Sequence, residues 1–261
     1  MANISVRYYS NCLRRTTSFN LVIPNDKRDD IPAEDNPYLS RDMKTLFLLH
    51  GYTGDGSNWV PEELCNKYNF AIVIPNGENS FWLDGPATGH EFCKMLGVEL
   101  IDYVRKTFGL AKKREDTCIM GLSMGGFGAL HTAFAYPEVF GKLVALSSAL
   151  IHHQVAEKEA GQGDDVANYD YYVGCFGDPS KLLESENNPE TLVKKIKATN
   201  APMPEIYMAC GRDDFLIENN RAFHRFLEEE KVDHTYIEDE GVHDMVFWSK
   251  YVQEFVPKLF G

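Results

Sequence analysis

The sequence is poor in basic charge. It contains 26 Lys and Arg residues against 39 Asp and Glu residues, which gives a formal net charge of −13 at pH 7. Such a chain has no surplus of cations to neutralise phosphates, so this balance disfavours a nucleic-acid binder. The same charge would repel polyanionic substrates. We therefore expect a small neutral substrate and no nucleic-acid partner.

Long apolar runs are also missing. No stretch is long enough to cross a bilayer, and residues 1–7 lack the charged and then apolar pattern of a signal peptide. From this we expect a cytoplasmic protein with no membrane partner. The sequence leaves the oligomeric state open, a homo-oligomer included.

Paired cysteines and metal-binding spacings are absent as well. The six cysteines are scattered without a Cys-x-x-Cys pair, and Cys118 and Cys210 lie in apolar runs where buried free thiols are usual. We expect all six to be reduced. His90-Glu91 is not followed by a second histidine at helical spacing, and the glycines of 125–128 are not followed by the Lys of a phosphate loop. The sequence thus predicts no metal and no cofactor.

The chain alternates strand-like and helix-like segments. Its 261 residues, 44% hydrophobic and 25% charged, suit a single α/β domain over 1–261. Near-continuous apolar runs such as 44–49 are typical of central parallel strands covered on both faces. The pattern predicts a mostly parallel sheet with helices on both faces and ligands beyond the carboxyl ends of its strands. The expected strands are 5–9, 18–23, 44–49, 70–74, 118–120, 142–147, 204–210 and 234–238, and the expected helices are 91–108, 129–135, 215–231 and 244–259.

Two segments break this alternation. Residues 25–42 are polar and contain prolines, which predicts a surface loop. Residues 149–201 contain an aromatic cluster and only one convincing helix, over 190–198. We expect 149–201 to be a lid-like insertion over the edge of the sheet, too short for an independent domain.

The chain is organised around Gly121-Leu122-Ser123-Met124-Gly125. An apolar run precedes this Gly-x-Ser-x-Gly pattern, and a helical segment follows it until Pro137, as a nucleophile elbow requires. A turn that presents one serine brings neighbouring backbone too close for a Cβ, which accounts for Gly121 and Gly125. Alternatively, the pattern is a glycine-rich turn with a serine cap.

A serine nucleophile needs a base and an orienting carboxylate, and both candidates follow later strands. Asp213 and Asp214 follow the strand predicted over 204–210, and His243 follows the strand predicted over 234–238. Either aspartate could instead cap the next helix, and the histidine could be a surface or capping residue. The order of serine, acid and histidine nevertheless matches a triad.

Acyl transfer also needs donors for a tetrahedral oxyanion. The backbone N–H of Met124, directly after the serine, is one candidate. The other is the N–H of Tyr52, in the loop that begins at His50-Gly51, although that loop could be a simple turn. Trp59 and Trp82 are candidate walls of the substrate pocket, and packing in the core or under a lid is the alternative for each.

These motifs resemble the putative-esterase family of α/β-hydrolases, which includes tributyrin esterases, S-formylglutathione hydrolases and feruloyl or acetyl-xylan esterases. The resemblance rests on the His50-Gly51 loop with Trp59, the elbow, the segment 210–216, and Gly241-Val242-His243 followed by Phe247-Trp248. It spans nearly the whole chain and is greatest to the tributyrin-esterase branch. It implies Ser123 as nucleophile, His243 as base and Asp214 as acid, because the family pattern Gly-x-x-Asp-x-Leu falls on Gly211 and Asp214.

The resemblance implies a serine carboxylesterase for short-chain acyl esters. A carbohydrate esterase acting on acetyl-xylan or ferulate esters, or an S-formylglutathione hydrolase, is the enzymatic alternative. A binding protein that has lost the chemistry of its hydrolase scaffold is the alternative from another class. The segment 149–201 matches no pattern that would decide the substrate.

Overall fold

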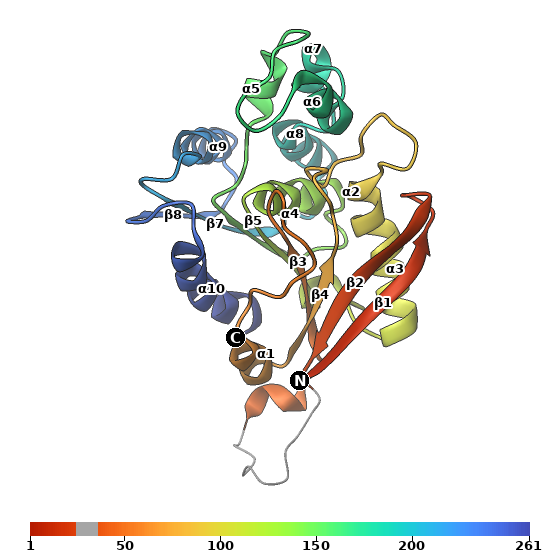
Figure 1. Cartoon of the computed structure of the whole chain (residues 1–261). Helices are drawn as coiled ribbons and strands as arrows, with labels where there is room; N and C mark the ends of the chain where they lie inside the picture. Colours follow the sequence, from red (N-terminus) through yellow and green to blue (C-terminus); the bar gives the residue numbers. More distant parts are fainter. Residues whose placement is uncertain (25–35) are drawn as a thin grey trace.

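The computed structural model describes residues 1–24 and 36–261. The described residues contain one eight-stranded sheet with helices on both faces (Figure 1). The strand order is β1-β2-β4-β3-β5-β6-β7-β8, and every neighbouring pair from β4 to β8 is parallel, whereas β1 and β2 are antiparallel to their neighbours. The mostly parallel sheet predicted from the sequence is confirmed. The strands are β1 (Ala2–Ser10), β2 (Arg15–Ile23), β3 (Lys44–Leu49), β4 (Phe70–Pro75), β5 (Thr117–Leu122), β6 (Lys142–Leu146), β7 (Glu205–Gly211) and β8 (Thr235–Asp239).

Successive side chains of the central strands alternate between two hydrophobic cores, one on each face of the sheet. In β3, Phe47 and Leu49 belong to the larger core, whereas Leu46 and Leu48 belong to the smaller one. Successive strand side chains point to opposite faces, so a strand covered on both sides reads as a continuous apolar run. Helices α1 (Glu62–Tyr68) and α10 (Met245–Phe260) cover the smaller core, and α3 (Ile101–Phe108), α4 (Met124–Ala135), α8 (Pro189–Thr199) and α9 (Ile217–Glu229) cover the larger one.

The helix predicted over 91–108 is continuous but not uniformly α-helical. It consists of α2 (Phe92–Lys94), a π-helical stretch over Met95–Leu100, and α3. Gly97 lies in the π-helical stretch, and a Cβ there would come within 2.0 Å of the Tyr136 ring. The widened turn therefore lies where the helix backbone packs directly against an aromatic side chain.

The segment 149–201 contains more helix than its sequence predicts. Besides α8, it forms α5 (His152–Ala156), α6 (Tyr169–Phe176) and α7 (Pro179–Leu182), and the prediction of a single helix is wrong. Helices this short have no stable periodicity signal and depend on tertiary packing. Here α5 and α6 bury Val155, Tyr172 and Phe176 in the larger core. In Figure 1 the green and teal ribbons of α5, α6 and α7 lie at the top of the molecule.

Three further expectations can be compared with the fold. All six cysteines are free, as expected, and all six are buried. The predicted surface loop over 25–42 falls mostly outside the described residues, and its final part contains a short 3₁₀ helix, Pro37–Ser40. Within the described ranges, no helix has both the length and the apolar character needed to cross a membrane.

Candidate active site

Ser123 occupies a strained turn between β5 and α4. Its backbone has φ 55° and ψ −120°, a conformation that non-glycine residues rarely adopt. Three backbone hydrogen bonds hold it there: its N–H donates to Leu146 O (2.8 Å), and its carbonyl accepts from Phe127 N–H (3.1 Å) and Ala149 N–H (3.0 Å). The Ser123 side chain forms no cap for α4. The geometry is that of a nucleophile elbow and not of a capped glycine turn.

The two glycines of the motif let three backbone segments meet. A Cβ on Gly121 would lie 2.0 Å from Gly125 O, and a Cβ on Gly125 would lie 2.3 Å from Leu49 O. Contacts this short with backbone atoms cannot be relieved by a side-chain rotation. The end of β3 and the start of α4 therefore touch only because residue 125 is a glycine.

We expect Gly125→Ala to destabilise the fold by about 2–3 kcal/mol, because the new methyl group must push α4 away from β3. Denaturant unfolding would measure the loss. Gly174→Ala is the matched control, since a Cβ at this helical position of α6 meets nothing within 4 Å. The control should be neutral or slightly stabilising. Equal stability of the two variants would contradict the packing argument.

The structure brings Asp214 and His243 together. The carboxylate of Asp214 accepts from His243 Nδ1, at 2.8 Å to Oδ2 and 3.0 Å to Oδ1. Asp214 is 2% exposed, and its Oδ1 also accepts the N–H of Leu216 at 2.9 Å. One aspartate therefore faces the histidine and also caps the turn before α9. The neighbouring Asp213 is exposed.

The Asp214 carboxyl is held in its ionised form. Burial raises its pKa, but hydrogen bonds from His243, the Leu216 N–H and Ser147 outweigh burial and leave the pKa below its usual value. The His243 ring also contacts two aromatic rings, with its centroid 4.5 Å from that of Phe215 and 4.9 Å from that of Trp248. Nδ1 therefore faces the carboxylate, and the two ring contacts restrict the orientation of the imidazole.

The loop after β3 lies against the elbow. A Cβ on Gly51 would be 3.4 Å from the Cβ of Ser123, so the backbone beside Tyr52 is next to the serine. His50 is 4% exposed and accepts the Gly77 N–H at Nε2 (2.9 Å), so its Nδ1 carries the proton and donates to Gly51 O (2.8 Å). His50 therefore fixes the loop and is not a base. Met124 begins α4, where an N–H has no partner four residues earlier in the helix.

A segment distant in sequence braces this loop. Asn79 accepts the Thr53 N–H at its side chain (2.8 Å) and the Tyr171 hydroxyl at its carbonyl (2.6 Å). The Tyr171 ring, from α6, meets the Tyr52 ring edge-on at 5.9 Å between centroids. The segment 149–201 is therefore in contact with the loop that carries the predicted oxyanion donor.

Comparison with known proteins decides the family. The family described as Putative esterase matches residues 39–259, which include the elbow, Asp214 and His243. The chain belongs to this esterase family. It is a carboxylic ester hydrolase with the α/β-hydrolase fold. An acetyl esterase of Caldicellulosiruptor saccharolyticus is 42% identical over 256 residues, covering 97% of this chain and 96% of that protein.

Solved structures agree with this assignment. FphF, a fluorophosphonate-binding serine hydrolase of Staphylococcus aureus, superposes with a TM-score of 0.83 at 26% identity and covers 100% of this chain and 98% of its own. An S-formylglutathione hydrolase of S. aureus gives a TM-score of 0.80 at 26% identity, with 100% and 99% covered. A ferulic acid esterase shares the fold at 19% identity, with a TM-score of 0.75 and coverage of 99% and 97%.

Two residues of the esterase that sequence reasoning did not connect to the site support the Asp214 carboxylate. The Oγ of Ser147, just after β6, accepts the indole N–H of Trp248 at 3.0 Å, and the same hydroxyl helps to lower the pKa of Asp214. A hydroxyl that accepts from the indole keeps its own proton for the carboxylate. Ser147 is fully buried and has φ 44°. A serine after a strand has no special sequence signal, so no pattern could have found it.

We expect Ser147→Ala to lower kcat about tenfold with little change in KM, because Asp214 loses a donor and holds His243 less firmly. The Trp248 N–H also loses its partner, which should cost about 1–3 kcal/mol of stability. Steady-state kinetics and thermal unfolding measure the two effects. A wild-type kcat would show that Asp214 needs only His243 and the Leu216 N–H.

The predicted pocket role of Trp82 is not supported. Its side chain is 0% exposed and donates from Nε1 to His50 O at 3.3 Å. A Cβ on Gly77 or Gly128 would collide with the indole, so Trp82 is packed beneath the loop after β3 and cannot touch a substrate. Trp59 is partly buried and packs against the smaller core, and its place in the pocket stays a prediction.

A cavity of about 310 Å³ lies beside the bracing contacts. Tyr171, Asn79 and Cys175 contribute to its wall, together with Glu78, Ser80, Ala87, His90, Phe92 and Gly174. The lining includes neither Ser123 nor His243. The cavity therefore adjoins the brace of the Tyr52 loop and not the predicted nucleophile.

Proposed function

We propose that this esterase hydrolyses short-chain acyl esters through a Ser123–His243–Asp214 triad. The observation that carries the proposal is the hydrogen bond between His243 Nδ1 and the buried Asp214 carboxylate, in a chain whose elbow presents Ser123. With Nδ1 occupied, Nε2 is the nitrogen that serves as base. The 42% identical acetyl esterase supports a small acyl group.

The proposed reaction proceeds through an acyl-enzyme. His243 takes the proton of the Ser123 hydroxyl as Oγ attacks the ester carbonyl. The N–H groups of Met124 and Tyr52 bind the oxyanion, and His243 returns the proton to the leaving alcohol. A water molecule, deprotonated by His243, then releases the acid. Asp214 holds the imidazole orientation throughout, and these steps need neither a metal nor a cofactor.

The insertion is the proposed determinant of substrate choice. Tyr171 links α6 to the Tyr52 loop through Asn79, so the segment 149–201 can shape the space in front of the oxyanion donors. A small neutral acyl ester agrees with the acidic chain. A thioester is the second candidate, supported by the S-formylglutathione hydrolase of similar structure.

The deciding experiment compares kcat/KM for p-nitrophenyl acetate, butyrate and octanoate with kcat/KM for S-formylglutathione, methyl ferulate and acetylated xylan. We expect acetate or butyrate to be turned over best, in a manner that depends on Ser123. Preference for xylan or ferulate would make the protein a carbohydrate esterase. Failure of Ser123 to react with a fluorophosphonate probe would instead favour a binding protein without chemistry.

A further inference from the structure

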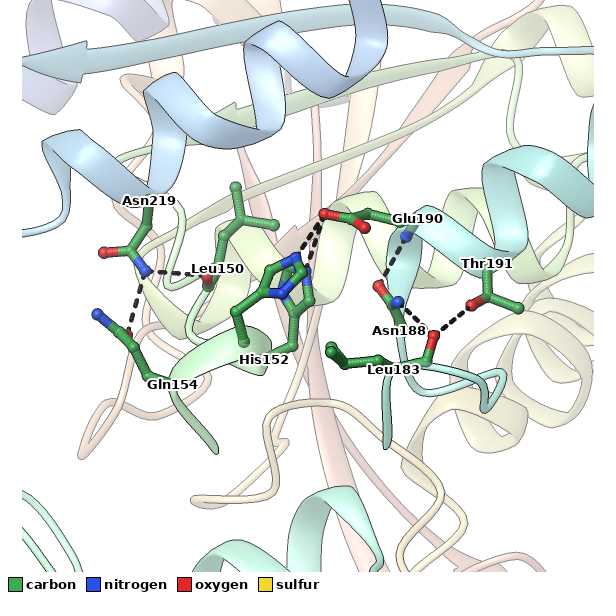
Figure 2. A network of polar contacts seen from close by, with 9 residues as sticks. Leu150, His152, Gln154, Leu183, Asn188, Glu190, Thr191 and Asn219 are labelled. Atoms are coloured by element: carbon green, nitrogen blue, oxygen red, sulfur yellow. Dashed lines mark hydrogen bonds and ion pairs between the residues drawn. The ribbon is translucent and has the colours of Figure 1, made fainter. Parts of the chain in front are cut away.

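Three side chains that the esterase mechanism does not use converge at the base of the insertion, and Figure 2 labels two of them, His152 and Glu190. His152 and His153 begin α5, and Glu190 lies in the first turn of α8. Both imidazoles direct Nε2 at the same carboxylate oxygen, Oε1 of Glu190, at 3.4 Å from His152 and 2.8 Å from His153. The potential ligand atoms of the three residues all lie within 4.8 Å of one another.

Both sides of the cluster are anchored by polar contacts. Asn188 accepts the Glu190 N–H (2.9 Å) and donates to Leu183 O (2.8 Å), which fixes the start of α8. On the other side, Asn219 of α9 donates to Leu150 O at 3.0 Å, just before α5. Figure 2 shows these contacts flanking the cluster. These contacts hold the backbone at the starts of α5 and α8, from which the three side chains project.

The spacing suits a tetrahedral metal ion. Zinc binds imidazole nitrogen at about 2.0–2.1 Å, so neighbouring ligand atoms of a tetrahedral site lie about 3.3 Å apart. The His152–Glu190 distance of 3.4 Å is close to that value, and the His153–Glu190 distance of 2.8 Å is about 0.5 Å shorter. The ligand atoms of the two histidines lie within 4.8 Å of each other. Two histidines and one glutamate are an established zinc ligand set, which leaves a fourth position for water.

Burial also suits a bound cation. The His152 side chain is 2% exposed and the Glu190 side chain is 17% exposed. The His153 side chain is 50% exposed and leaves the cluster open to solvent.

Without an ion, each histidine can donate from Nε2–H to Oε1 of Glu190. His152 Nδ1 is then a buried acceptor with no hydrogen-bond partner among the described residues. A divalent ion would replace the two Nε2 protons and bind both ring nitrogens and the carboxylate. The two rings lie 4.6 Å apart between centroids.

We propose that His152, His153 and Glu190 bind a divalent transition-metal ion of the zinc class. The ion ties α5 to α8 and plays no part in ester chemistry. It lies behind the elbow: the ring of Phe127, whose N–H donates to Ser123 O, is 6.4 Å from the ring of His152. The ion therefore stabilises the base of the insertion beside the strained serine. Sequence spacing could not show this site, because its ligands lie 37 or 38 residues apart.

The test is calorimetric titration of the chelator-treated full chain with ZnCl₂, together with the visible absorption of the Co²⁺ complex. We expect one Zn²⁺ per chain and the spectrum of tetrahedral Co²⁺. A free Zn²⁺ concentration about a hundred times Kd should raise the Tm of the protein by roughly 5 °C. His153→Asn and Glu190→Gln should each weaken Zn²⁺ binding at least about tenfold. Removing a residue that only hydrogen-bonds to a metal ligand already costs about that much affinity, and these variants remove a ligand itself.

His224→Asn is the matched control. His224 Nδ1 faces His234 Nε2 at 2.7 Å, a histidine pair elsewhere on the chain that could bind metal adventitiously. The control should keep wild-type affinity and the Zn²⁺-dependent Tm shift. Equal Zn²⁺ binding by wild type and both site variants would overturn the proposal, as would the absence of saturable binding or selective loss in His224→Asn. The half-exposed position of His153 and the near-identical shape of a glutamine side chain at position 190 make misfolding an implausible cause of a loss.

Discussion

Ser123→Ala should lower kcat/KM for p-nitrophenyl acetate by at least about 10³-fold, because no other group can form the acyl-enzyme. Covalent labelling by a fluorophosphonate probe should disappear with it. The fold should be unaffected: the side chain of Ser123 caps nothing, and alanine keeps the same Cβ in the strained turn. Thermal unfolding should therefore give a Tm close to that of the wild type.

Ser249→Ala is the control for this result. Ser249 lies in α10, two residues past Phe247, where alanine is the better helix former. It should keep wild-type kinetics and remain labelled by the probe. Substantial turnover or labelling in Ser123→Ala would remove the serine from the mechanism, and the elbow would then have to be interpreted as a structural turn.

Asp214→Asn should lower kcat about 10⁴-fold, whereas Asp213→Asn should remain within about twofold of the wild type. The amide introduced at position 214 can donate to His243 Nδ1 and so stabilise the wrong tautomer, and it cannot balance the imidazolium that forms during attack. Asp213 is one residue away and carries the same charge, but it is exposed. The pair of variants therefore separates a specific contact from the loss of local negative charge. The reverse outcome would move the acid to residue 213.

The same substitution has a pH-dependent effect on stability. The pKa of Asp214 is lower in the folded protein than its usual value, so its ionised form stabilises the fold above that usual value. This contribution is lost as the pH falls through the lowered pKa. Asp214→Asn should therefore lower the Tm at pH 7, and the difference from the wild type should shrink on acidification. A difference that does not change with pH would contradict this assignment.

The sequence determined the features that depend on local pattern. Apolar runs such as 44–49 and 70–74 predicted central parallel strands because a strand covered on both faces must be apolar throughout, and the sheet confirms them. The glycines at 121 and 125 predicted a tight turn, and the elbow shows why a Cβ is forbidden there. The motifs also identified the esterase family, which the comparison confirms.

The tertiary structure decided what depends on contacts between distant segments. Residue spacing left Asp213 and Asp214 as alternatives, because two polar residues after a strand differ only in which way the turn directs their side chains. Folding buries Asp214 against His243 and leaves Asp213 exposed. It likewise brings Ser147 to the indole of Trp248 and buries Trp82 in the core.

The segment 149–201 shows the same division between local pattern and tertiary contacts. Its short helices cannot form on local propensity alone, so their sequence carried little signal, and packing against the larger core defines them. The convergence of His152, His153 and Glu190 follows from that packing, since α5 and α8 are separate in sequence. Local pattern thus determined the strands, the elbow and the family, whereas the partners of each polar side chain were decided only when the segments met in three dimensions.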